Sequence, residues 1–149
     1  MVLQETYELI DATVYDDFET SYTNALNYNG LNVQYELTSE WYTHGSKSVK
    51  CTLENYSQSY VGYGANAPSQ FIGSTVNFKI NYKAMTTGKF IAMYQQNGSW
   101  IYAKTTNISV GEGIIDDSVD IPSDATGFRL RFMNFTNGGV IYLDEWVVY

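Results

Sequence analysis

The sequence predicts an all-β fold, an antiparallel β-sandwich or jelly roll, in a single domain. Three observations support this prediction. Apolar and polar residues alternate with period two along several segments, which is the pattern of half-buried strands. Aromatic residues are abundant, with 14 Tyr, 7 Phe and 3 Trp against only 2 Pro. Finally, 149 residues with 44% hydrophobic content suffice for one packed core.

The predicted strands follow one another in short runs, each bounded by Gly, Asn, Ser or Thr. These runs are 7–19, 46–55, 74–84, 88–96, 99–109, 127–135 and 138–149. In the segment 128–133, for example, Phe128, Leu130 and Phe132 fall on one face and Arg129, Arg131 and Met133 on the other. Seven or more such strands with turns between them favour a sandwich with jelly-roll topology.

Local turn chemistry separates these runs. The pairs Asn29-Gly30 and Asn97-Gly98 and the triplet at 137–139 tolerate positive φ and predict hairpins. The segments 39–45 and 120–127 are each compatible with a short helical turn. We expect residues 16–149 to form the domain and residues 1–15 to be a leading strand or the end of a linker.

Charge and rare residues narrow the classes of function. Eight Lys and Arg face sixteen Asp and Glu, and the formal charge of -8 disfavours nucleic acid or an anionic membrane as partner. No run approaches the roughly 20 apolar residues of a membrane span, and the start lacks the basic and apolar segments of a signal peptide. The one cysteine, Cys51, is expected in the core, and a single histidine, His44, disfavours a zinc site or a Ser-His-Asp triad.

Five sequence features resemble the β-jelly-roll carbohydrate-binding modules. They are the Asp-Phe-Glu at 17–19, Trp41, the segment 44–50, the aromatic run 59–63 and the closing strand 141–148. Such modules are non-catalytic domains of polysaccharide-degrading enzymes, with related forms on adhesins and phage tails. The resemblance implies binding of a polysaccharide or cell-surface glycan outside the cell or on a virion or cell surface, within a larger multidomain or multimeric protein.

The resemblance also implies a structural calcium ion. Its ligands would be Glu19, Gly45, Lys47 and Asp144, with loop carbonyl groups supplementing the carboxylates. Calcium takes six to eight oxygen ligands including carboxylates, so two acids together with loop carbonyl groups are chemically adequate. The alternative is that Glu19 and Asp144 accept hydrogen bonds from backbone N–H groups or pair with Lys47.

Two aromatic clusters are candidates for sugar binding, because sugar rings stack on aromatic faces while polar groups read their hydroxyls. Tyr94, Gln96 and Trp100 flank one polar hairpin, and Tyr60 and Tyr63 form a second cluster. Arg131 is expected on the same concave sheet face. The alternative is that these rings only stabilise the sheets, as cross-strand aromatic pairs do.

The acidic stretch 112–124 is interpreted as a solvated loop and strand edge. Glycoside hydrolysis needs two carboxylates facing each other across a cleft, and nothing in the sequence pairs these acids in that way. We therefore expect no catalysis. Two alternatives to glycan binding stay open: a structural or adhesive sandwich of a phage tail or cell-surface protein, and, more weakly, a small glycan-active enzyme.

Overall fold

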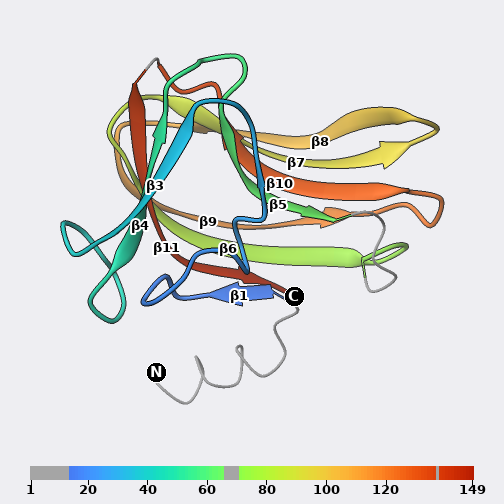
Figure 1. Ribbon diagram of the computed structural model, residues 1–149. Helices are drawn as coiled ribbons and strands as arrows, with labels where there is room; N and C mark the ends of the chain where they lie inside the picture. The colour runs from blue at the N-terminus through green and yellow to red at the C-terminus, as the bar shows by residue number, and fades with distance from the viewer. Residues whose placement is uncertain (1–13, 66–70, 137) are drawn as a thin grey trace.

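A computed structural model describes residues 14–65, 71–136 and 138–149, which form two antiparallel sheets packed face to face (Figure 1). Sheet A has the order β3-β4-β11-β6-β9, with β1 also paired to β11. Its strands are β1 (Val14–Asp16), β3 (Val33–Thr38), β4 (Ser48–Leu53), β6 (Thr75–Ala84), β9 (Gly111–Asp120) and β11 (Gly139–Val148).

Sheet B has the order β2-β5-β10-β7-β8. Its strands are β2 (Tyr28–Asn29), β5 (Tyr60–Ala65), β7 (Gly88–Gln96), β8 (Ser99–Ile108) and β10 (Gly127–Met133). All pairings in both sheets are antiparallel. The predicted antiparallel sandwich with jelly-roll topology is therefore confirmed.

Aromatic side chains join the two sheets at the centre of the core. Trp146 of β11 is fully buried, and its ring centroid lies 6.0 Å from that of Phe132 on β10 and 6.4 Å from that of Phe90 on β7. Phe90 and Phe132 are 4.8 Å apart. Cys51 is buried, as predicted, and burial raises the pKa of its thiol.

The six predicted runs from residue 46 onward each contain a strand. Of the run 7–19, the structure describes only the part from residue 14, which contains β1, and residues 1–13 lie outside the described ranges. β2, β3 and β5 lie outside the predicted runs. The acidic stretch is mostly the ten-residue edge strand β9 rather than a loop, since Ile115 and Val119 alternate into the core.

Two of the predicted hairpins were wrong. Asn97 and Gly98, with φ of 52° and 77°, do join β7 to β8 in a tight hairpin. The chain after Asn29-Gly30 instead leaves sheet B for sheet A. The strands on either side of the predicted turn at 137–139, β10 and β11, likewise belong to different sheets, and residue 137 itself lies outside the described ranges. The described residues contain no helix, so the helical turns considered at 39–45 and 120–127 are absent and no helical membrane span is present among them.

Candidate functional site

One set of aromatic and Arg side chains gathers on the outer face of sheet B, away from the core. Antiparallel pairing places Tyr60 of β5 opposite Met133, and Trp100 of β8 opposite Gln95. Alternation along β10 sends Phe128, Leu130 and Phe132 inward, so the residues between them face outward. We call this set the aromatic face; its residues are Tyr28, Tyr60, Trp100, Tyr102, Arg129 and Arg131.

Arg129 lies at the centre of the aromatic face between two rings. Its guanidinium carbon is 3.7 Å from the centroid of Trp100 and 4.2 Å from that of Tyr28. Both distances are within cation–π range, and a planar guanidinium can stack on a ring in a way that an ammonium cannot. The stacking fixes the orientation of a half-buried Trp that remains partly open to solvent.

Arg131 makes a similar arrangement with a second pair of rings. Its guanidinium carbon is 4.4 Å from the centroid of Tyr60, and its Nη2 donates to the Tyr102 hydroxyl at 3.4 Å. The Tyr60 and Tyr28 ring centroids are 4.9 Å apart, so both arginines belong to one connected cluster. The pKa of Tyr60 is raised, mainly by desolvation and secondly by a hydrogen bond with the Tyr28 hydroxyl. Tyr60 therefore stays a neutral hydrogen-bonding group at physiological pH.

Glycines on β5 allow these side chains to lie flat on the sheet. A Cβ on Gly62 would be 1.9 Å from the Leu130 carbonyl oxygen and 2.7 Å from the Arg131 Cα, so no side chain fits there. A Cβ on Gly64 would be 3.0 Å from the Tyr28 ring. A small apolar cluster supports Tyr60 and Trp100 from below; it consists of Ile91, Met93 and Met133.

Half of the predicted ligand-binding residues meet on this face, namely Tyr60, Trp100 and Arg131. The assignment of Tyr63 to the same surface was wrong. Tyr63 is 9% exposed and packs in the core, 6.2 Å from the ring of Phe71. It lies three positions from Tyr60 on one strand, and residues an odd number apart point to opposite faces.

Tyr94 and Gln96 also point away from the aromatic face. Tyr94 lies opposite Phe128 and packs against the core. The Gln96 side chain donates to the Asp124 carboxylate at 2.8 Å. The predicted ligand-binding residues did not include Tyr28, Tyr102 or Arg129. Tyr102 lies two residues after Trp100 and Arg129 two residues before Arg131, so alternation along the strands would have placed both on the same face.

A second polar arrangement holds residues 39–47, here called the 39–47 loop, against the outer face of sheet A. Asp144 Oδ2 accepts hydrogen bonds from the backbone N–H groups of Thr43 and His44 at 2.7 and 2.8 Å, and from the Thr43 hydroxyl at 3.0 Å. Its other oxygen, Oδ1, is buried and has no hydrogen-bond partner among the described residues. Desolvation outweighs these hydrogen bonds and raises the pKa of Asp144.

Glu19 holds the other end of the same loop. Its Oε1 accepts from the Ser46 N–H and hydroxyl at 2.9 and 3.0 Å, and its Oε2 accepts from the Lys47 N–H at 3.0 Å. Partial desolvation opposes ionisation of Glu19, but these hydrogen bonds prevail and lower its pKa. Gly45, with φ of 68°, lies so close that a Cβ would be 2.5 Å from the Glu19 carboxyl carbon.

The predicted calcium ligands therefore do come together at one loop. Gly45 and Lys47 belong to the 39–47 loop, and Glu19 and Asp144 accept hydrogen bonds from its N–H groups. The two carboxylates accept N–H groups, which is the alternative that the sequence left open. Among the described residues, no group of three or more His, Cys, Asp or Glu side chains is placed to hold a metal ion. A calcium ion here would use Asp144 Oδ1 and backbone carbonyl groups, and calcium binding stays a prediction.

Several carboxylates of the acidic stretch make contacts with neighbouring side chains. Asp117 of β9 pairs with Lys104 of β8 at 2.7 Å, and this ion pair links an edge strand of sheet A to an edge strand of sheet B. Asp120 accepts from the Thr75 hydroxyl at 2.7 Å. These contacts show structural roles for two of the acids, and they do not form the facing carboxylate pair that glycoside hydrolysis requires.

No protein-family model and no curated protein matches the sequence. Solved structures do match the fold. A xylan-binding domain of the family 22 carbohydrate-binding modules superimposes with a TM-score of 0.72 at 17% identity, over 92% of this chain and 93% of that one. A Clostridium thermocellum endo-1,4-β-D-xylanase 10B, crystallised as module and catalytic domain with xylohexaose, gives 0.69 at 13% identity over 93% of this chain and 28% of that one.

A third match is the bacteriophage CBA120 tailspike protein 4, with a TM-score of 0.53 at 15% identity, over 79% of this chain and 19% of that one. Identities this low establish the fold alone. The chain has the β-jelly-roll fold of the carbohydrate-binding modules.

Proposed function

We propose that this domain binds a neutral polysaccharide on the aromatic face of sheet B, without catalysing a reaction. One observation carries the proposal: Arg129 is stacked between Tyr28 and Trp100, which come from the two edge strands of the sheet. The rings are thereby held in place across the whole width of sheet B before any ligand arrives. Preorganisation of this kind lowers the entropic cost of binding.

The chemistry of the aromatic face suits sugar rings. The partly exposed rings offer apolar surfaces to the C–H faces of a sugar. The hydroxyl of Tyr102, which is 54% exposed, and the guanidinium of the partly exposed Arg129 offer hydrogen bonds to its hydroxyls, whereas Arg131 is buried beneath the rings that it contacts. Because the groups come from four of the five strands of sheet B and reach both of its edges, a chain of several sugar units fits this surface better than a single compact molecule.

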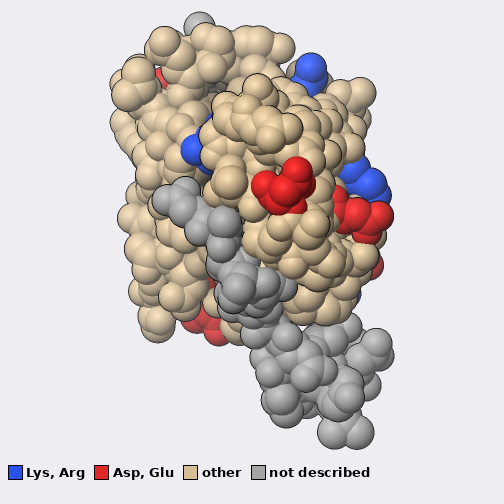
Figure 2. Space-filling model, turned by 90° about the vertical axis from the view of Figure 1, so that its right-hand side faces the viewer, with Lys and Arg blue, Asp and Glu red and all other residues tan. Residues whose placement is uncertain are grey.

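The charge of the domain favours a neutral ligand. The formal charge of -8 opposes a polyanion in general. In the view of Figure 2, charged side chains occupy a few separate spots and most of the described surface is uncharged. Xylan is the first candidate ligand, because two of the matching structures are of xylan-binding or xylohexaose-bound proteins.

The same proposal covers the setting of the domain. We infer that it acts outside the cell, as a targeting module of a larger protein, because the matching modules occur in longer chains such as the xylanase. The tailspike match has the lower TM-score of 0.53, and it shows only that a similar fold occurs in a phage tail protein. A purely structural sandwich is the competing function, and it predicts no glycan binding at all.

Affinity electrophoresis tests the proposal directly. The wild-type domain is run through native gels that contain xylan, soluble β-glucan or galactomannan. We expect retardation by at least one of them, and at least tenfold weaker binding for Trp100→Ala and for Tyr60→Ala, since central aromatic contacts dominate binding energy. Tyr149→Ala is the matched control, because it removes a 38% exposed tyrosine whose backbone pairs with Asn77 in sheet A, and it should bind as the wild type does. Equal mobility of the wild type in all gels would favour the structural alternative.

A further inference from the structure

A separate hollow of about 340 Å³ lies on the outer face of sheet A, the layer opposite the aromatic face. The 39–47 loop forms one wall, and strands β6 and β9 form the floor. Its lining includes Trp41, Thr43, Asn81, Glu112, Gly113 and Ile114. Neither the aromatic face nor the predicted calcium site uses Trp41 or Glu112, so their arrangement needs its own explanation.

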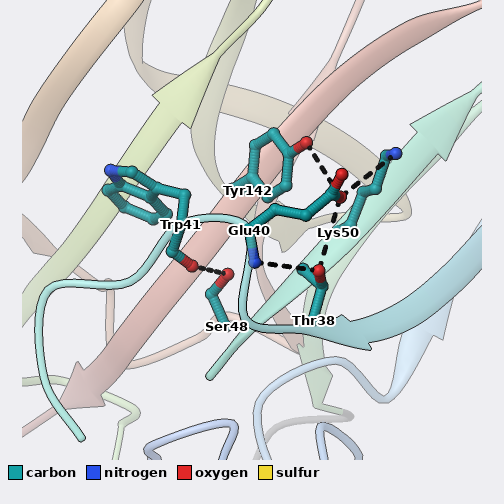
Figure 3. Close-up of polar contacts among 6 residues, drawn as sticks. All are labelled: Thr38, Glu40, Trp41, Ser48, Lys50 and Tyr142. Atoms are coloured by element: carbon teal, nitrogen blue, oxygen red, sulfur yellow. Dashed lines mark hydrogen bonds and ion pairs between the residues drawn. The ribbon is translucent and has the colours of Figure 1, made fainter. Parts of the chain in front are cut away.

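Trp41 is held in one orientation across this hollow. Its indole Nε1 donates to Glu112 Oε1 at 3.0 Å, which links the loop to the edge strand β9. Its carbonyl accepts a hydrogen bond from the buried Ser48 hydroxyl, as Figure 3 shows. Its ring centroid is 6.2 Å from that of Tyr142 on β11. The ring therefore bridges β11 and β9 over β6, fixed before any ligand binds.

Tyr142 is itself fixed, which makes the support of Trp41 rigid. Glu40 accepts a hydrogen bond from the Tyr142 hydroxyl at 3.3 Å and pairs with Lys50 at 3.4 Å, and Figure 3 shows the three groups together. Lys50 also lies 5.9 Å from the Tyr142 ring centroid. An isolated exposed ion pair contributes little to stability, but this network limits the movement of the ring beside Trp41.

The chemistry of the hollow is that of a small sugar site. Trp41 gives an aromatic ring, and Ile114, which is 59% exposed, adds apolar surface beside it. Glu112 supplies a carboxylate whose Oε2 accepts no hydrogen bond from the described residues, so it can accept one from a sugar hydroxyl. The volume is at the lower end of the range of about 300 to 1,000 Å³ for ligand pockets, which suits one sugar unit or a chain end.

We propose that this hollow is a second binding site for a neutral sugar unit, independent of the aromatic face; this inference rests on the proposed glycan-binding function. Glu112 would repel an anionic sugar, and the ring beside it selects a ligand with an apolar face. Two sites on opposite layers of one sandwich allow the domain to hold two polysaccharide chains at once. On an insoluble polysaccharide the two contacts would raise the overall avidity above either affinity.

The three tryptophans provide a built-in test by NMR. Trp100 reports on the aromatic face, Trp41 on the hollow, and Trp146 on the core. The wild-type domain, labelled with ¹⁵N, is titrated with xylohexaose, cellohexaose and mannohexaose while the indole N–H signals are followed. We expect the Trp41 and Trp100 signals to shift with separate binding curves while the Trp146 signal stays in place.

The variant Glu112→Ala separates the two sites. It removes a charged acceptor, so we expect about tenfold weaker binding read at Trp41 and an unchanged curve at Trp100. Trp100→Ala removes the reporter of the aromatic face, so it is read at Trp41, where we expect an unchanged binding curve. A Trp41 signal that stays fixed while Trp100 responds would overturn the second site and leave the proposed function standing. A response of Trp41 alone would support the hollow and refute the aromatic face, and no response to any of the three sugars would overturn both.

Discussion

Arg129 illustrates how one residue organises the candidate site. It lies on the central strand β10, and its guanidinium contacts rings from β2 and β8, the two edge strands of sheet B. Each such contact is worth about 0.5 to 2 kcal/mol depending on its exposure to solvent. The residue therefore couples the two edges of the sheet through side chains, in addition to the hydrogen bonds of the backbone.

The alternation of side chains along a strand explains which site residues could be predicted from the sequence. The alternation in 128–133 placed Arg131 opposite the core, and this was confirmed. Tyr60 and Tyr63 were grouped because they are near in sequence, but only Tyr60 shares the outer face. Tyr28 could not have been identified in this way, since the two-residue strand β2 is too short to show a period.

Glu19 carries a pH-dependent contribution to stability. Its lowered folded pKa means that the contribution is present above the ordinary pKa of a glutamate and is lost as the pH falls through the folded value. We expect Glu19→Gln to lower the free energy of unfolding by about 1 kcal/mol at pH 7, because its hydrogen bonds to the loop lose their charge assistance. Urea denaturation at pH 7 and at pH 3 should show this gap at pH 7 and a much smaller one at pH 3.

Glu54→Gln is the control for that measurement. Glu54 is an exposed carboxylate that accepts a hydrogen bond from the Gln34 side chain at 3.2 Å. Its replacement should change stability by less than about 0.5 kcal/mol at either pH. A gap for Glu19→Gln that persists unchanged at pH 3 would contradict the role given to its charge.

At the scale of elements, local signals were more reliable than expectations that depended on topology. Asn97-Gly98 forms its hairpin because both residues adopt the positive φ that such a turn requires. Asn29-Gly30 has the same composition, but the strands on either side of it pair in different sheets. The stretch that forms β9 was interpreted as a loop and strand edge rather than as a full strand, because its charged residues conceal a short inward-facing set that includes Ile115 and Val119.

The 39–47 loop gives a test of the predicted calcium ion. A ligand that binds only the native state adds RT ln(1 + [L]/Kd) to its stability, about 2.7 kcal/mol at a hundredfold excess over Kd. We expect added calcium to raise the melting temperature of the chelator-treated domain, and Asp144→Asn to remove most of that increase. Equal melting temperatures in calcium and in EDTA would show that the carboxylates serve the loop N–H groups alone.

For the whole molecule, the spacing of strands predicted a sandwich, but the sequence did not reveal the order of strands in each sheet. β5 pairs with β10, which lies far from it in the sequence, and β4 pairs with β11 across more than half of the chain. Such non-local pairings are decided by the joint packing of both layers, which a period of two within one strand does not encode. The aromatic face depends on that order, because its residues come from β2, β5, β8 and β10.

Trp146 packs the two sheets against each other in the core. It is fully buried, belongs to sheet A, and contacts Phe90 and Phe132 of sheet B. We expect Trp146→Ala to lower the free energy of unfolding by about 3 to 5 kcal/mol, as large-to-small core substitutions do. Trp41→Ala, at a half-buried loop position, should cost far less in the same chemical denaturation. Similar costs for the two variants would contradict the core described for this sandwich.

The most direct test of the central claim is calorimetric titration of xylohexaose into the wild-type domain and into Arg129→Lys. Lysine keeps the charge but cannot stack between the Tyr28 and Trp100 rings. The account predicts saturable binding to the wild type and at least tenfold weaker binding to Arg129→Lys, with both proteins folded by circular dichroism. Equal affinity of the two proteins, or no binding heat from the wild type with either xylohexaose or cellohexaose, would contradict it.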